Sequence, residues 1–204
     1  GPVETYRADL SDLSQVARLG RDVVADHDRI DVLINNAGVF KTDKPTAADG
    51  QDVRFVVNTL APALLTRLLL PAIPQGGRIV HLSSAAQAPV DLAALAGQRQ
   101  LDAMEAYAQS KLALTMWSQA LASELGREGP VTVAVNPGSL LATNMVRKAA
   151  LSDAFAEATG RYFDNDSGRF APPHGDAANA EKVADVARAI EARIADHLKE
   201  RRDA

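Results

Sequence analysis

The sequence predicts an α/β fold, with a doubly wound parallel sheet in a three-layer sandwich. Short apolar segments alternate with longer segments of helical periodicity, and turn-forming residues close the apolar segments. The 204 residues contain no internal repeat and no linker, and a chain of this length can bury one substantial core. We therefore expect a single domain over residues 1–204.

Four segments are interpreted as parallel strands because each is short and largely apolar. They are Val3–Leu10, Ile30–Ile34, Arg78–Leu82 and Val131–Val135. Tyr162–Phe163 is interpreted as a short edge strand, and the segment Asp164–Asp176, rich in Gly, Pro and Asp, as a loop.

The longer segments carry apolar residues three and four positions apart, which is typical of helices that bury one face. The first helix is expected to begin after Ser11, whose hydroxyl can cap it, and to bury Leu13 and Val16. Further helices are expected over Ala47–Leu70, Leu101–Gly126 and Ala180–Arg202.

Composition excludes several classes of function. A formal net charge of −4 gives no electrostatic reason to expect nucleic acid or an anionic membrane surface as a partner. The absence of cysteine excludes disulfides and thiolate chemistry. The four histidines show no ligand spacing, so no metal site is expected, and His81 is expected to pack in the sheet.

The longest apolar segment, Leu60–Pro74, is expected to be too short and too interrupted to span a bilayer. The first residues of the chain show no pattern of a secretory signal. We therefore expect a cytoplasmic protein that acts on a small molecule and does not associate with a membrane.

Three polar clusters follow predicted strands, at residues 35–38, 83–84 and 136–138. In sheets of this kind, ligands bind beyond the carboxyl ends of the strands. The sequence therefore predicts that these clusters lie along one rim of the sheet and form the site.

Tyr107 and Lys111 are four residues apart, so one face of a helix holds them together. An ammonium near a phenol favours the phenolate and lowers its pKa, which suits proton transfer to or from an alcohol oxygen. The alternative is a surface tyrosine packed on the lysine stem. Ser84 supplies a hydroxyl at the end of a strand, or else it only turns the chain.

Asn58 lies four residues before Pro62 within a helical pattern. Because proline has no N–H, the Asn58 carbonyl loses its helical partner and the helix is expected to kink. The free carbonyl could hold a water, or the kink could serve packing alone.

The ordered motifs resemble the classical short-chain dehydrogenase/reductase family, and the later part of the chain resembles its retinol-dehydrogenase-like branch. The motifs are Asp9-Leu10, Asn35-Asn36-Ala37-Gly38, Asn58, Ser84, Tyr107-Ala-Gln-Ser110-Lys111 and Asn136-Pro137-Gly138. The resemblance implies a Rossmann-like NAD(P)-binding domain and an oxidoreductase that interconverts a carbonyl and an alcohol by hydride transfer with NADP or NAD.

The resemblance also implies roles for single residues. Tyr107 would be the general acid or base, and Lys111 would lower its pKa and hold the nicotinamide ribose. Ser84 would bind the substrate oxygen, and the Asn58 carbonyl would hold a water linked to Lys111. The cofactor would be contacted by Asp9, Leu10, Asn35, Asn36, Ala37, Gly38, Pro137, Gly138 and Thr143, together with Tyr107 and Lys111.

The chain departs from the family pattern in two places. The sequence contains no Thr-Gly-x-x-x-Gly-x-Gly turn, so the first βαβ portion of the fold is expected to be missing. Thr143 falls one position later than usual after Pro137-Gly138, which puts its cofactor contact in doubt. The sequence could be part of a longer enzyme, which is the interpretation we favour, or a catalytically inactive binding or interaction module that has lost cofactor binding.

The helix Leu101–Gly126 carries more apolar residues than one buried stripe needs. In the family the corresponding helix often forms a dimer interface, so a homodimer is expected. The alternative is that Gln87–Gln100 folds over this face and leaves a monomer.

Overall fold

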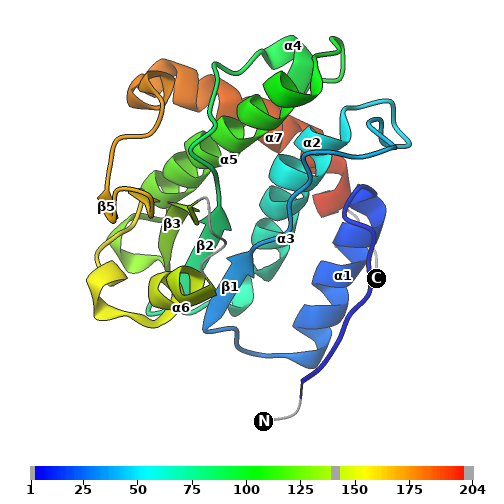
Figure 1. Ribbon diagram of the computed structural model, residues 1–204. Coiled ribbons are helices and arrows are strands. Elements are labelled where there is room, and N and C mark those ends of the chain that lie inside the picture. Colours follow the sequence, from blue (N-terminus) through cyan, green and yellow to red (C-terminus); the bar gives the residue numbers. More distant parts are fainter. Residues whose placement is uncertain (1–2, 139–142, 200–204) are drawn as a thin grey trace.

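A computed structural model describes residues 3–138 and 143–199. The strands form one central sheet (Figure 1), in the order β1-β2-β3-β4-β5. The strands are β1 (Val32–Asn35), β2 (Arg78–Leu82), β3 (Val131–Asn136), β4 (Tyr162–Asp164) and β5 (Arg169–Phe170). The first four strands are parallel, and β5 pairs antiparallel with β4. The predicted α/β fold is confirmed.

Helices precede, connect and follow the strands. They are α1 (Leu13–Asp26), α2 (Val53–Phe55), α3 (Ala61–Leu69), α4 (Leu92–Leu95), α5 (Ala103–Leu125), α6 (Thr143–Leu151) and α7 (Ala180–Lys199). A π-helical turn, Val56–Leu60, joins α2 to α3. Single 3-10 turns span Leu70–Ala72, Gly126–Glu128, Asp153–Phe155 and Gly175–Ala178.

The core lies on both faces of the sheet, as a three-layer sandwich requires. On one face, α1, α3, α5 and α7 enclose the larger apolar cluster, which includes Leu64, Leu112 and Ile190. On the other face, α6 and the segment around Phe155 cover a smaller cluster. In the described part of the chain, the second helical layer is therefore much thinner than the first.

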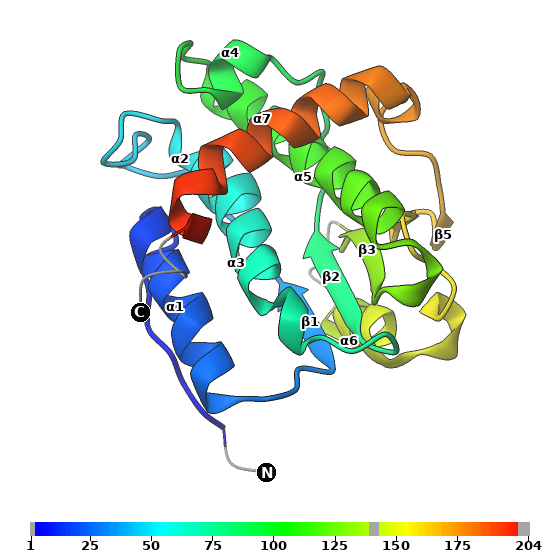
Figure 2. The ribbon, with the colours of Figure 1, turned by 180° about the vertical axis from the view of Figure 1, so that it is seen from behind.

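The first predicted strand is wrong. Residues 3–9 run beside α1 without a strand partner in the described chain (Figures 1 and 2), and the Tyr6 hydroxyl donates to Asp26 at 2.8 Å. An apolar alternation forms a strand only where a neighbouring strand accepts its backbone hydrogen bonds. The outer edge of β1 is consequently unpaired in the described residues, and Ile34 there is 40% exposed.

Asp12 rather than Ser11 caps α1. The Asp12 carboxylate accepts from the backbone N–H of Ser14 at 2.9 Å, whereas the Ser11 N–H and hydroxyl both donate to Asp9. The predicted long helix Ala47–Leu70 begins later, at Val53, since the Asp52 carboxylate caps it there.

The predicted kink in this helix is present as a π-helical turn. The N–H of Ala61 bonds the Val56 carbonyl, five residues back, directly before Pro62. A π turn of this kind accommodates a residue that the regular hydrogen-bond ladder cannot.

Residues Val53–Ala72 are long and apolar enough to cross a membrane by length and composition alone, with a mean hydropathy of 1.5. However, 67% of the apolar window is buried within the fold. The apolar character of this segment is therefore explained by the core, and the cytoplasmic location stays a prediction.

The apolar face of α5 is covered by α7, which crosses α5 and α3 on their outer side in Figure 2. The Trp117 indole N–H of α5 donates to Glu191 of α7 at 2.8 Å, and Arg67 of α3 bridges Glu191 and Glu124. The surplus apolar residues on which the homodimer prediction rested are thus used within one chain. The oligomeric state itself stays a prediction.

The carboxyl-terminal prediction is largely confirmed. Tyr162–Phe163 does form a strand, β4, but the segment interpreted as a loop contains β5, which occupies the sheet edge instead. The last helix is described to Lys199, and the remainder of its predicted span lies outside the described residues.

Candidate active site

The three polar clusters lie side by side. Asn35 at the end of β1 is in register with His81 of β2, and Leu82 of β2 with Val135 of β3. Because β1, β2 and β3 are parallel neighbours, the turns that follow them share one rim of the sheet. The structure confirms the location of the rim predicted from the sequence.

Lys111 lies beneath this rim and is only 4% exposed. Its Nζ donates to the Leu82 carbonyl at 2.7 Å and lies 5.9 Å from the centre of the Tyr107 ring. Burial lowers the pKa of Lys111 to about 8, because an ammonium loses hydration there. Among the described residues, one of its three N–H donors has a protein partner, the Leu82 carbonyl, and the other two can bond a ligand.

Tyr107 lies half-buried on the same helix face, and its ring packs against Phe40 at 4.9 Å between centroids. In the described part of the chain, no protein group bonds its hydroxyl. This phenol is therefore available to a substrate oxygen, with the ammonium of Lys111 beside its ring.

Asn58 is fully buried, and its side chain has a role that the spacing alone did not reveal. The side chain accepts from the Val39 N–H at 2.7 Å and donates to the Val39 carbonyl at 2.9 Å and to the Ser110 hydroxyl at 3.0 Å. Asn58 therefore ties the turn after β1 to α5. The backbone carbonyl of Asn58 receives no α-helical hydrogen bond from the residue four positions later, because that residue is Pro62, which has no N–H.

Gly38 lies between these groups. A Cβ at this position would be 3.3 Å from Lys111 Nζ and 3.4 Å from Asn58 Oδ1. The missing side chain keeps the turn close to Lys111 and leaves the space above it open.

Ser84 follows β2. Its Oγ accepts from the Ala86 N–H at 3.1 Å, and within the described ranges its hydroxyl proton has no protein acceptor and can bond a ligand. Its neighbour Ser83 is buried, and the Ser83 hydroxyl lies 2.7 Å from that of Thr115. Of the two serines, Ser84 is the one that faces the site.

Four of the residues predicted to contact a cofactor line one small cavity. Leu10, Asn35, Asn36 and Ala37 all line it, together with Pro62. Asp9, beside Leu10, has a lowered pKa because its carboxylate accepts hydrogen bonds from Ser11.

The side chain of Asn35 points into the core. It donates to Thr66 at 3.0 Å and contacts the ring of His81 at 3.1 Å. His81 packs within the sheet as expected, and burial lowers its pKa to about 3, which keeps the ring neutral. Asn35 can therefore reach a ligand only through its backbone.

The turn after β3 is held by the segment that follows β4. The Gly138 N–H donates to Asn136 Oδ1 at 3.1 Å, and Asn165 donates to the Pro137 carbonyl at 3.0 Å. Gly138 has a φ of +86°, a conformation that favours glycine. Thr143 is the first residue of α6, but its side chain lies outside what the structure describes.

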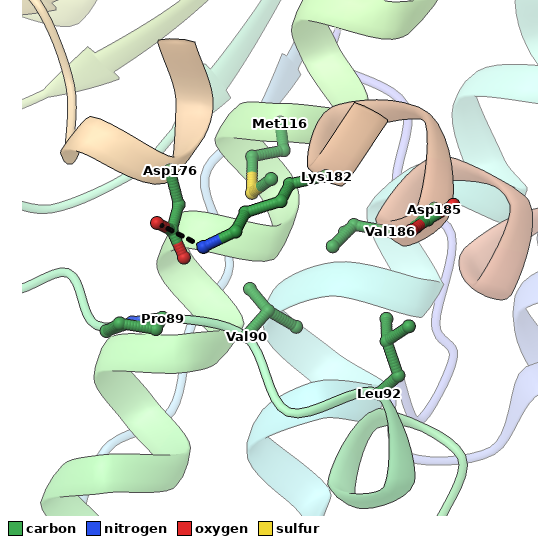
Figure 3. A pocket seen from close by; sticks show the side chains of 8 residues that line it. All are labelled: Pro89, Val90, Leu92, Met116, Asp176, Lys182, Asp185 and Val186. Atoms are coloured by element: carbon green, nitrogen blue, oxygen red, sulfur yellow. Dashed lines mark hydrogen bonds and ion pairs between the residues drawn. The ribbon is translucent and has the colours of Figure 1, made fainter. Parts of the chain in front are cut away.

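A separate pocket, shown in Figure 3, lies between α5, α7 and the segment before α4. It is lined by Pro89, Val90, Leu92, Met116, Asp176, Lys182, Asp185 and Val186. The ion pair between Asp176 and Lys182, at 2.8 Å, closes one side of it. None of these side chains belongs to the rim site, so the pocket is not the place of the chemistry inferred from the rim.

The family model for short chain dehydrogenases matches residues 1–154. The chain belongs to this family. Retinol dehydrogenase 13 of Mus musculus is 36% identical over 141 residues, which are 67% of this chain and 42% of that protein. Human retinol dehydrogenase 11 is 36% identical over 138 residues, 66% of this chain and 43% of that protein. This short-chain dehydrogenase chain thus spans less than half the length of these two curated relatives.

Solved structures agree with this membership. An uncharacterised protein from Mycobacterium paratuberculosis superposes with a TM-score of 0.73 and 29% identity, covering 94% of this chain and 75% of that one. A short-chain dehydrogenase/reductase family oxidoreductase from Brucella ovis, solved with partially ordered NAD, has a TM-score of 0.57 and 25% identity and covers 80% of this chain and 79% of that one. The fold of this short-chain dehydrogenase is therefore a Rossmann-type α/β fold, and the family uses NAD or NADP.

Two groups around the site escaped the sequence analysis. Phe40 packs on Tyr107 because Arg54, buried in an ion pair with Asp52, donates to the Phe40 carbonyl at 2.8 Å. Tyr162 bonds Ser84 from 78 residues away. No local signal marks either contact, since each depends on how distant segments meet.

Proposed function

We propose that this chain is part of an NAD(P)-dependent oxidoreductase that interconverts a carbonyl and an alcohol. The observation that carries the proposal is the buried Lys111 ammonium beside the free phenol of Tyr107, on the rim where Ser84 offers a hydroxyl donor. A phenol hydroxyl beside a cation and a second hydroxyl donor is an arrangement that can pass a proton to or from a substrate oxygen.

The residues present fit a nicotinamide cofactor. In the part of the chain that the structure describes, Lys111 keeps two N–H donors without a protein acceptor next to Gly38, and a separate small cavity lined by Leu10, Asn36 and Ala37 lies at the end of β1. When bound, the cofactor supplies or accepts the hydride. Lys111 would hold its ribose, and the turn at Pro137-Gly138 would border it.

In the reducing direction, the Ser84 hydroxyl donates to the substrate carbonyl and stabilises the negative charge that develops on its oxygen. The Tyr107 hydroxyl then gives its proton to that oxygen. Lys111 favours the resulting phenolate by its positive charge. In the oxidising direction, the Tyr107 phenolate accepts the alcohol proton.

The test is a titration of the chain with NADPH and NADH, followed by nicotinamide fluorescence, together with turnover assays on aliphatic and aromatic carbonyls. Saturable binding and turnover are expected. Tyr107→Phe should abolish turnover and leave cofactor affinity nearly unchanged, since it removes one hydroxyl. Tyr6→Phe is the matched control, because Tyr6 lies beside α1 and should leave turnover at its original level.

Turnover retained by Tyr107→Phe would overturn the assignment of the acid. A folded chain that binds neither nucleotide would leave two interpretations: a catalytically inactive module that has lost cofactor binding, or an incomplete part of a longer enzyme.

A further inference from the structure

The carbonyl of Ser84 accepts two hydrogen bonds. The Tyr162 hydroxyl donates to it at 2.9 Å, and the Gln87 side chain at 3.0 Å. A carbonyl oxygen has two lone pairs, so these two donors fill it. The peptide group that follows Ser84 is thereby fixed from both sides.

Tyr162 is well suited to this contact. It lies in β4, in register with Ala134 of β3, and is only 6% exposed. Burial raises its pKa, so its hydroxyl remains protonated and keeps donating across the working pH range.

The same carboxyl-terminal segment makes further contacts with the rim. The His174 N–H donates to Gln87 at 2.8 Å, so the second donor to Ser84 is itself held by this segment. Asn165 donates to the Pro137 carbonyl, and the Asn136 amide donates to Asp164 at 2.7 Å. Residues 162–174 therefore contact the turns after both β2 and β3, and we name them the clamp segment.

We propose that Tyr162 is a positioning residue, which fixes the Ser84 carbonyl and through it the direction of the Ser84 hydroxyl. The proposal rests on the proposed function, in which that hydroxyl bonds the substrate oxygen. Tyr162 itself touches no reacting atom, because its own hydroxyl is occupied by the backbone of Ser84.

The experiment is a double-mutant cycle with Tyr162→Phe and Ser84→Ala, measured as kcat and KM. Because misaligned groups lose much of their effect, Tyr162→Phe should lower kcat about tenfold and leave the cofactor Kd nearly unchanged. In the Ser84→Ala background, Tyr162→Phe should have no further effect, since the hydroxyl it positions is gone. Equal losses in both backgrounds would overturn the proposal. Tyr6→Phe serves again as the control.

A second readout does not depend on activity. The ¹³C resonance of the Ser84 carbonyl should shift in Tyr162→Phe and stay in place in Tyr6→Phe. A Ser84 carbonyl resonance that does not move in Tyr162→Phe would show that the Tyr162 hydroxyl does not bond this carbonyl. A wild-type chain without turnover would overturn the proposed function and the catalytic consequence, while the resonance would still decide whether Tyr162 holds Ser84.

Discussion

Lys111 is a cation almost without contact with water. Such a group raises the energy of the folded state unless a partner offsets its lost hydration, and here the partner is one backbone carbonyl. The cost is consistent with a catalytic role, because active sites often keep residues that stability alone would not favour.

This burial predicts a pH dependence of stability. Burial lowers the pKa of Lys111 to about 8 in the folded chain, below the 10.5 of an exposed lysine. Between these values the unfolded chain binds a proton that the folded chain does not, so the free energy of unfolding should rise as pH increases. The slope is at most about 1.4 kcal/mol per pH unit.

Lys111→Met should remove this rise, because methionine does not titrate. Urea unfolding of both proteins from pH 7.5 to 10.5 gives the free energy of unfolding at each pH. The difference between the two proteins removes the contribution of the titrating groups that they share. Equal slopes would show that Lys111 is hydrated in the folded chain.

The sequence indicated Tyr107, Lys111, Ser84 and Asn58 because spacing or position relative to a strand marks each of them. It could not indicate the Asn58 side-chain contacts, since Val39 and Ser110 lie 19 and 52 residues away. Contacts over such separations depend on helix crossing and strand register, which local patterns do not encode.

Among the elements, α1 and α3 approach each other closely at Gly20. A Cβ on Gly20 would lie 2.8 Å from Leu68 Cδ1 and 2.9 Å from Leu68 Cβ. The second atom cannot move aside by a change of rotamer, so a side chain here must separate the two helices.

Gly20→Ala should therefore destabilise the protein. Alanine favours a helix over glycine by about 1 kcal/mol, whereas overpacking costs about 1–3 kcal/mol, so we expect a net loss of about 1 kcal/mol. Thermal or urea unfolding measures it. Arg18→Ala, at an exposed position of the same helix, should change stability little. A stabilised Gly20→Ala would show that the helices can separate without loss.

Element boundaries followed the sequence where packing and local signals agreed. Arg78–Leu82 was predicted with the observed bounds, because an apolar run there is buried between two strands. Residues 3–10 carried an equally strand-like pattern but lack a partner strand. The helix expected from Ala47 begins at Val53, because the Asp52 carboxylate caps the helix there although the apolar periodicity extends further back.

At the scale of the whole molecule, the sheet has two edge strands in the described residues, β1 and β5. The edge at β1 carries an exposed apolar side chain, Ile34. Unpaired backbone groups next to an exposed apolar side chain favour strand addition between chains.

We expect this chain to associate increasingly as its concentration rises, and Ile34→Lys to reduce that association by placing a charge on the edge. Sedimentation velocity over a concentration series measures it. Leu151→Lys is the matched control, because Leu151 is 64% exposed but lies at the end of α6. An equal reduction of self-association by both variants would indicate non-specific hydrophobic association rather than pairing of the β1 edges.

The position of the clamp segment late in the sequence affects how the chain folds during synthesis on the ribosome. Ser84, Tyr107 and Pro137 are synthesised before Tyr162, Asn165 and His174, which hold the turns after β2 and β3 in place. The bond from Arg67 to Glu191 spans 124 residues, so the outer helix also docks late. Closing such long loops slows folding. The nascent chain therefore carries all four predicted catalytic side chains for some time before the site acquires its working geometry.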